Sequence, residues 1–208
     1  MTAQVRIFGT VISTYTRIVQ ITCEEVGLSH ETVATLAHAP ENRHPFGKVP
    51  VVEVDGLELF ESVSISQYLD NAYNSGGLQP ADPAVRAVMD RWIAIANNYL
   101  FPLFENGLVM PWIMHQYFGA DLDQEKIGRA LPNISRALAF LDAEIANDGA
   151  WTKGTFDLSN VFVYSVLRGL QMTPQGSIGI AQCPMVSAWM TETEQRGAIR
   201  EIRWESEG

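Results

Sequence analysis

Two short alternating segments, joined by a turn and followed by a helical pattern, form the clearest signal in the chain. Over residues 51–54 and 57–59, apolar side chains occupy every second position, as in two strands that each bury one face. The Asp-Gly pair between them tolerates the positive φ angles of a two-residue hairpin turn. The apolar spacing then becomes helical, with Ser62 or Ser64 able to cap. The pattern predicts a hairpin that runs straight into the N-terminus of a helix.

The residues before this hairpin predict two more strands with a helix between them. Residues 5–8 form a short apolar strand that Gly9 ends, and an apolar helical face then runs to Gly27. Residues 31–36 are rich in β-branched types and predict the second strand. The resulting order, β-α-β, an irregular segment and then β-β-α, is that of a thioredoxin-like α/β domain.

A dense cluster of turn-forming residues divides the chain. Residues 74–83 concentrate Gly, Pro, Asn and Ser, and the segments after them follow helical spacing. We therefore expect an α/β domain over residues 1–75, a linker over residues 76–83 and an all-α domain over residues 84–208.

Several residues in the helical part are expected to interrupt or start helices. Pro102, Gly107 and Pro111 should bend or break its first long helix. Asp157, followed three residues later by Asn160, has the pattern of a helix N-cap. We expect this cap to be structural.

Composition and charge exclude several classes of protein. The 208 residues are 47% hydrophobic, which is ample for a buried core, and the net charge of −10 repels phosphate backbones, so we expect no nucleic acid partner. The two cysteines, Cys23 and Cys183, form no Cys-x-x-Cys pair, which fits a reducing compartment. No basic apolar leader and no apolar run of bilayer length are present. We expect a soluble cytoplasmic protein that does not enter a membrane.

The junction between the hairpin and its helix carries the candidate chemistry. A helix N-terminus offers backbone N–H groups and the positive end of a dipole, which suit a small carboxylate. Glu61 can accept from an ammonium group there, while Ser62 donates to a carboxylate, so the pair suits an amino acid head group. If the Val49–Pro50 bond is cis, the main chain of Val49 can pair with a bound peptide like an added strand. The alternative is a capped hairpin-helix unit without a ligand.

The residue types over 45–62 resemble those of a known family. Pro-Phe-Gly-Lys-Val-Pro, the Asp-Gly hairpin and Phe-Glu-Ser resemble the glutathione site of cytosolic glutathione S-transferases. The run Ser-Thr-Tyr-Thr-Arg that begins at Ser13 is similar to the serine-type phi and theta classes. The resemblance spans nearly the whole chain and is most specific over residues 5–70. It implies a thioredoxin-like domain followed by an all-helical one, with glutathione as co-substrate and no metal.

The resemblance also implies how the thiol is activated. A free thiol with a pKa of about 8.5 is only slightly ionised at neutral pH, so such an enzyme must lower that pKa. Ser13 falls at the family's catalytic position, where the hydroxyl donates to sulfur and does not attack. Thr14 is the rival donor. A plain helix-capping role is the alternative for Ser13.

Further residues gain roles from the resemblance. The glutathione-binding set that it implies is Thr14, His38, Lys48, Val49, Pro50, Glu61 and Ser62. Within this set, Lys48 and His38 are expected near the glycyl carboxylate, whereas His44 in the same segment is expected to be a surface residue. Phe46, flanked by Pro and Gly, has little chance of burial in its own hairpin, and an aromatic residue at this family position inserts between helices of a partner's second domain. The resemblance therefore implies a homodimer.

The leading interpretation is a glutathione transferase that attacks a hydrophobic electrophile or reduces an organic hydroperoxide. Part of the Met-rich and aromatic run over residues 92–118 should line the electrophile site. The competing interpretation is a non-catalytic glutathione-binding or protein-interaction module of the same fold. A thiol-disulfide oxidoreductase is disfavoured, because position 13 is serine and no Cys-x-x-Cys motif exists.

Overall fold

The computed structural model describes residues 4–147 and 151–202. Contacts divide the chain into two compact units. The first holds the residues up to Arg86 and those from Glu194 onward, and the second holds the residues from Ala87 to Thr193. The domain limits expected from the sequence, 1–75 and 84–208, stay a prediction about which parts fold together.

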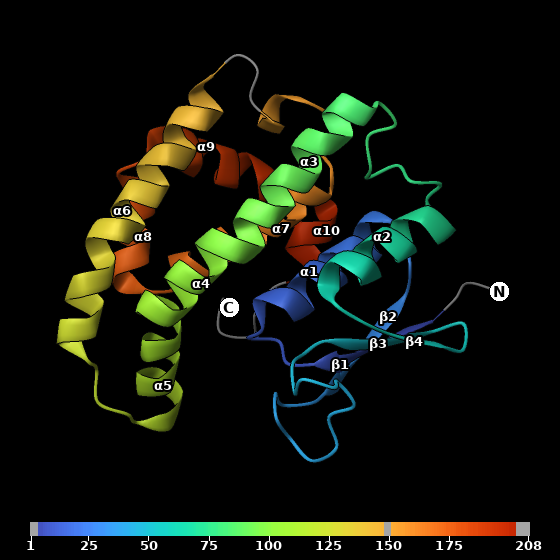
Figure 1. Cartoon of the computed structure of the whole chain (residues 1–208), viewed down its shortest axis with the longest axis horizontal. Helices are drawn as coiled ribbons and strands as arrows, with labels where there is room; N and C mark the ends of the chain where they lie inside the picture. The colour runs from blue at the N-terminus through green and yellow to red at the C-terminus, as the bar shows by residue number, and fades with distance from the viewer. Residues whose placement is uncertain (1–3, 148–150, 203–208) are drawn as a thin grey trace. The chain divides into compact units, whose positions relative to one another are not determined.

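The first unit is built on a four-stranded mixed sheet (Figure 1). Its strands are β1 (Val5–Gly9), β2 (His30–Ala34), β3 (Val51–Val54) and β4 (Leu57–Phe60), in the spatial order β2-β1-β3-β4. β1 pairs in parallel with β2 and antiparallel with β3, and β3 pairs antiparallel with β4. Asp55 and Gly56 turn the hairpin with φ angles of +50° and +79°, as the Asp-Gly pair predicted. The predicted thioredoxin-like arrangement is confirmed.

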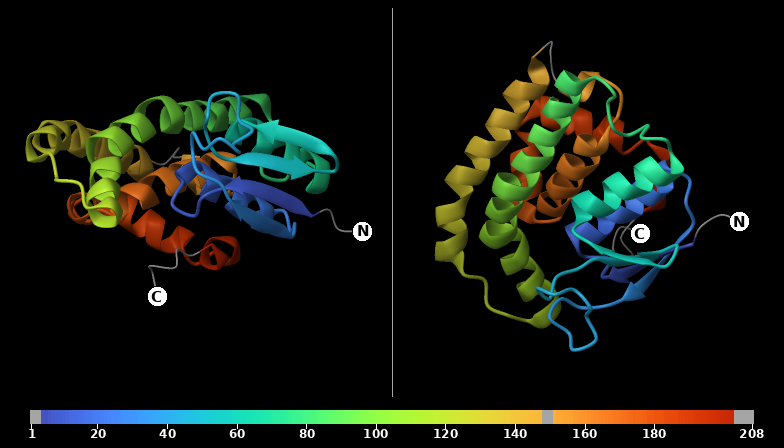
Figure 2. Two further views of the ribbon diagram at one scale, coloured as in Figure 1. Left: turned by 90° about the horizontal axis from the view of Figure 1, so that it is seen from below. Right: turned by 45° about the vertical axis from the view of Figure 1, so that its right-hand side comes forward.

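Two helices cover one face of this sheet. α1 (Thr14–Glu25) and α2 (Ser62–Tyr73) pack side by side there (Figures 1 and 2). The alternation within β1 and β3 turns every second side chain toward them. The core formed in this way consists of Val5, Ile7, Val19, Cys23, Leu28, Val52, Val54, Ile65 and Leu69.

A charged cluster covers part of the opposite face. The guanidinium groups of Arg6 and Arg43 lie 5.0 and 4.0 Å from the ring centre of Phe8. Arg6 donates to Glu53 at 2.9 Å, and Arg43 bonds both Glu53 and, at 2.7 Å, Glu58. The hydrogen bond from Arg43 helps hold the pKa of Glu53 below its usual value. Arg43 belongs to the irregular segment between β2 and β3, so this segment is anchored on the sheet.

The turn-forming cluster after α2 is ordered around one buried carboxyl group. Asp70 is fully buried, and one of its oxygens accepts from the Asn74 side-chain amide at 2.8 Å and from the Leu78 N–H at 2.9 Å. The other oxygen accepts from the Gln79 side-chain amide at 2.9 Å. Residues 74–79 are therefore held by the last turns of α2, although their composition alone suggests a free linker.

The second unit consists of helices (Figure 1). The helical elements after the sheet are α3 (Pro83–Ile95), η1 (Ala96–Leu100), α4 (Phe101–Phe104), η2 (Glu105–Val109), α5 (Met110–Phe118), α6 (Gln124–Ala146), η3 (Trp151–Lys153), α7 (Leu158–Gln171), α8 (Pro174–Ala181), α9 (Pro184–Thr193) and α10 (Gly197–Glu201). α3 starts in the first unit, and α10 belongs to that unit as well. No helix in the described ranges combines the length and hydrophobicity that a bilayer crossing requires.

The helical run over residues 83–118 continues through its prolines by means of two π-helical turns. Pro102 and Pro111 each follow directly after a residue whose N–H bonds a carbonyl five positions earlier, Phe101 to Ala96 and Met110 to Glu105. The wider turn changes the hydrogen-bond register just before a ring that would clash in an α-helix. The predicted interruption is therefore a change of helix type, and the helix does not end.

α7 is the buried centre of the second unit. Asp157 caps it, and the capping box is complete, because the Asp157 side chain accepts from the Asn160 backbone N–H and the Asp157 N–H donates to Asn160 Oδ1 at 2.9 Å. Asp157 Oδ1 also accepts from the Ser159 N–H at 2.9 Å. Nearly every side chain from Leu158 to Leu170 is buried. The predicted structural cap is confirmed.

The Asp70 network generates a prediction about stability. Replacing Asp70 by Asn should lower the free energy of unfolding by about 2 kcal/mol, because an NH₂ donor would then face donors from Leu78 or Gln79. Urea denaturation followed by circular dichroism measures this. Asp121→Asn makes the same change at an exposed position and should have little effect. Equal stability of the two variants would contradict the role given to Asp70.

Candidate functional site

The topology of the sheet collects most of the predicted site residues at one edge. Because β1 and β3 are antiparallel, with Phe8 opposite Val51, the end of β1 lies beside the start of β3. Val51 is also opposite Phe60, so the start of β3 lies beside the end of β4. Ser13 follows β1, Pro50 precedes β3 and Glu61 follows β4. Residues that are far apart in the sequence thus gather at the edge where α1 and α2 begin.

Ser13 is the N-cap of α1. Its Oγ accepts a hydrogen bond from the Thr16 N–H at 3.3 Å, which leaves the hydroxyl proton available to another acceptor. Capping and donation to a ligand, which the sequence presents as alternatives, are therefore compatible. Thr14 is the first helical residue and is buried, whereas Ser13 is half-buried. Gly9 allows α1 to approach β1 closely, because a Cβ there would lie 2.3 Å from Thr16 Oγ1.

The N-terminus of α2 has no side-chain cap, contrary to the prediction that Ser62 or Ser64 would provide one. Glu61 occupies the N-cap position, makes no capping hydrogen bond and adopts a φ of +70°. Ser62 is the first residue of the helix and is buried. The first-turn N–H groups of α2 therefore lack the partner that a capping side chain would give them, and they remain available to an anion. The unusual φ of Glu61 could not be read from the sequence, because it depends on the way the strand enters the helix.

The segment before β3 offers an unpaired main chain. The Val49–Pro50 peptide bond is cis, and Pro50 is buried. Within the described ranges, neither the N–H nor the C=O of Val49 forms a hydrogen bond. Lys48 is exposed, and its carbonyl accepts from the Asn42 side chain at 2.9 Å. This arrangement can accept an added peptide strand.

The irregular segment holds both candidate histidines. His38, with a φ of +59°, is exposed, and its N–H donates to the Gly47 carbonyl at 2.9 Å. A Cβ on Gly47 would lie 2.4 Å from His38 Nδ1, so the ring packs directly on the residue before Lys48. His44, expected at the surface, is instead buried at 7% exposure. That expectation was wrong, because residues distant in the sequence cover the ring.

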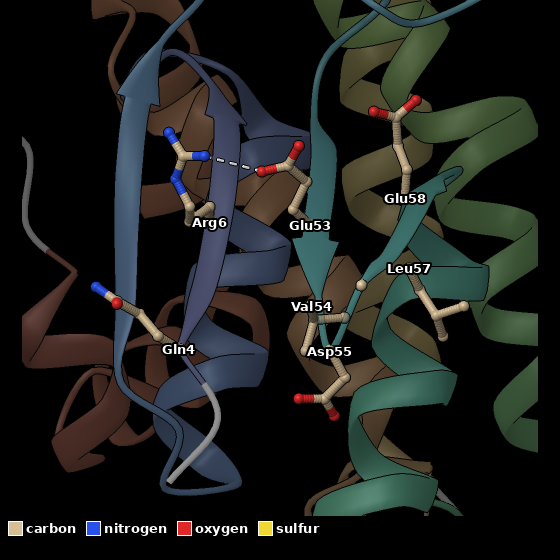
Figure 3. Close-up of a pocket in the computed structure, with 8 residues that line it drawn as sticks. Gln4, Arg6, Glu53, Val54, Asp55, Leu57 and Glu58 are labelled. Atoms are coloured by element: carbon tan, nitrogen blue, oxygen red, sulfur yellow. Dashed lines mark hydrogen bonds and ion pairs between the residues drawn. The ribbon is translucent and has the colours of Figure 1, made fainter. Parts of the chain in front are cut away.

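A hollow of about 270 Å³ lies away from this edge (Figure 3). It surrounds the hairpin turn, at the opposite ends of β3 and β4, and Arg6 donates to Glu53 within it. None of the predicted site residues lines it.

Neither cysteine has the properties of a nucleophile. Burial raises the pKa of the Cys23 thiol to about 12 and also raises the pKa of Cys183, so both stay protonated at neutral pH. Both are free. The part of the chain that the structure describes contains no cluster of three His, Cys, Asp or Glu residues suited to a metal ion.

Comparison with known proteins gives this edge its context. Residues 7–80 match the family model for the glutathione S-transferase N-terminal domain. The chain is 28% identical over 159 residues to glutathione S-transferase F14 of Arabidopsis thaliana, a match that covers 74% of this chain and 62% of that protein. It is 26% identical over 208 residues to glutathione S-transferase 1 of Zea mays, with 96% of each chain covered.

A solved structure extends the likeness to three dimensions. The theta class glutathione S-transferase of Xanthomonas axonopodis pv. citri, solved with glutathione bound, is 25% identical with a TM-score of 0.81 and 95% of each chain covered. These matches agree with the thioredoxin-like sheet and the helical second unit. Residues 7–80 therefore form a domain of the glutathione S-transferase N-terminal type, and nearly the whole chain is similar to glutathione S-transferases.

Proposed function

We propose that this chain is a glutathione transferase that ionises the thiol of glutathione and presents the thiolate to a hydrophobic electrophile. The observation that carries the proposal is the meeting of two helix N-termini at one sheet edge. The N-terminus of α1 is capped by the half-buried Ser13 hydroxyl, whereas the N-terminus of α2 has no side-chain cap. Such an edge suits a ligand that carries a sulfur anion at one point and a carboxylate at another.

Ser13 is the proposed thiolate donor. Ionisation releases the thiol proton to solvent, and the Ser13 O–H then donates to sulfur near the positive end of the α1 dipole. Lowering the thiol pKa by two units requires about 2.7 kcal/mol, which a hydroxyl donor and a helix N-terminus can supply together. The thiolate forms a bond to the electrophilic carbon, and the leaving group departs with its electron pair. Thr14 can assist through its amide.

The rest of glutathione is proposed to lie along the same edge. Glu61 accepts from the γ-glutamyl ammonium group, and Ser62 with the first turn of α2 donates to the adjoining carboxylate. The unpaired main chain of Val49, followed by Pro50, pairs with the cysteinyl residue. Lys48 and His38 serve the glycyl carboxylate, supported by the packing of the His38 ring on Gly47.

The electrophile is proposed to be apolar. α5 exposes four large apolar side chains at helical spacing, Met110, Met114, Tyr117 and Phe118. Methionine and aromatic groups adapt to apolar ligands of varied shape. The two free cysteines support the further proposal that the protein works in the reducing cytoplasm.

Replacing Ser13 by Ala should raise the pKa of bound glutathione. At neutral pH less thiolate would be present, so kcat/KM should fall by about tenfold and the pH profile should move to higher pH, while glutathione affinity stays within a few-fold. Ultraviolet titration of the thiolate in the binary complex measures the pKa. Ser29→Ala, at an exposed position, is the matched control.

These measurements distinguish Ser13 from Thr14 as the thiolate donor, and an enzyme from a binding module. An unchanged thiol pKa in Ser13→Ala would reject the assignment, and a larger shift in Thr14→Ala would identify the neighbour as the donor. Wild-type protein that is retained on immobilised glutathione but turns over no aryl halide would be a non-catalytic binding module.

Glu61→Ala should weaken glutathione binding with little effect on the chemical step. The carboxylate holds the end of glutathione that is far from sulfur, so KM should rise by about tenfold while kcat stays similar. Calorimetry measures the affinity directly. Glu31→Ala, which removes an exposed carboxylate from β2, serves as control. Undiminished affinity in Glu61→Ala would exclude the placement of the γ-glutamyl group.

We further propose a homodimer in which Phe46 enters the second unit of a partner copy. Phe46 is 71% exposed, which leaves a large apolar side chain in water on the isolated chain. A hollow of about 320 Å³ lies between the α4–η2 region and α6. Its lining combines apolar residues with polar and charged ones, namely Pro102, Leu103, Asn106, Gly107, Lys126, Arg129, Ala130 and Asn133. Its shape depends on Gly107, because a Cβ there would lie 2.8 Å from the Ala130 Cβ. A twofold axis would bury two copies of the contact.

Phe46→Ala should weaken the dimer by about 2 kcal/mol for each copy of the contact and also lower glutathione affinity, since Lys48 and Val49 follow closely. Sedimentation equilibrium measures the association. Phe118→Ala removes another exposed aromatic group as control. A monomeric wild type, or a Phe46→Ala dimer as tight as the wild type, would end the proposal.

A further inference from the structure

The buried His44 ring contacts two aromatic rings of the first unit. Its side chain is only 4% exposed, and its ring centre lies 5.1 Å from that of Phe60 and 6.1 Å from that of Phe46. Phe60 is the last residue of β4 and comes directly before Glu61. The ring therefore lies where the irregular segment meets the strand that leads into α2.

The hydrogen bond at one ring nitrogen determines which nitrogen carries the proton. The Phe46 N–H donates to His44 Nδ1 at 3.1 Å, so Nδ1 must be an unprotonated acceptor. The neutral ring then carries its proton on Nε2. This nitrogen lies 3.9 Å from Glu61 Oε1. The donor edge of the imidazole thus faces the carboxylate.

The Glu61 carboxylate has little else to orient it. Its side chain is 66% exposed and forms no capping bond with α2. Among the described residues, only His44 places a basic side-chain nitrogen within 4 Å of the Glu61 carboxylate. A glutamate side chain free to rotate must lose that freedom when it binds an ammonium group, which weakens binding.

We propose that His44 is a positioning residue for Glu61, whose Nε2–H dipole biases the carboxylate toward the orientation that receives the γ-glutamyl ammonium group of glutathione. The inference rests on the proposed function of Glu61. At 3.9 Å the contact is too long for a direct hydrogen bond, so the influence is electrostatic and modest. It acts on glutathione binding and not on the thiolate.

The two ring nitrogens can be tested separately. His44→Asn keeps an acceptor near the Nδ1 position for the Phe46 N–H but leaves no donor that reaches Glu61. His44→Gln extends an amide NH₂ to the Nε2 position and so restores that donor. His30→Asn is the matched control, because it breaks another imidazole–carboxylate pair of the same unit, His30 Nε2 to Glu24 Oε1 at 3.0 Å.

Steady-state kinetics with varied glutathione provides the test. His44→Asn should raise KM for glutathione by about threefold with kcat unchanged within about twofold, and His44→Gln should recover most of the loss. In a Glu61→Gln background, His44→Asn should have no further effect on KM. His30→Asn should leave KM unchanged.

Two results would overturn the inference. One is an unchanged KM in His44→Asn, and the other is an equal rise in KM with or without the Glu61 carboxylate, which would mean that the ring only supports the segment. Failure of the wild-type chain to bind glutathione would instead remove the proposed function, and the positioning role with it.

Discussion

The antiparallel pairing of β1 with β3 is the contact on which the candidate site depends. It sets Phe8 opposite Val51, and this register brings the start of α1 to the same edge as the cis peptide bond before β3. A slip of one residue would turn Val52 and Val54 away from the core, so the burial of these side chains fixes the register. The energy that stabilises the domain and the geometry that assembles the site thus come from the same packing.

The two faces of the sheet are stabilised in different ways. The helical face is an apolar core, whereas the other face is partly covered by a segment without helix or strand. Two residues hold that segment. Arg43 packs over the Phe8 ring on the sheet, and the Asn42 side chain donates to the carbonyls of Leu36 and Lys48 at 3.2 and 2.9 Å. Hydrogen bonds from a few polar side chains replace the regular backbone pairing that a helix would provide. Lys48 and His38, which are proposed to bind glutathione, belong to this segment.

The order of the strands and helices could be predicted from the sequence, whereas the backbone angles at one junction and the contacts between distant segments could not. The Asp-Gly turn and the Asp157 cap each depend on residues next to one another in the chain, and both were predicted correctly. The α2 cap was predicted wrongly, because the positive φ of Glu61 changes which residue holds the N-cap position. His44 was misjudged because its cover includes Phe60, which lies on another strand. Among the proposed site residues, Glu61, Ser62 and Val49 could be suggested from the hairpin-helix junction, whereas Ser13 depended on the resemblance, since a serine at a helix start is ordinary on its own.

The two π-helical turns in the run from α3 to α5 also change how that run presents its side chains. A π turn holds about one residue more than an α turn, so each one rotates the following helix by about 100° relative to an unbroken α-helix. The exposed faces of α3 and α5 are therefore not in phase, although the backbone continues from one to the other. Gain or loss of a single residue at η1 or η2 would keep the helix intact and turn a different set of side chains outward, which gives evolution a compact way to alter an apolar surface without rebuilding the unit.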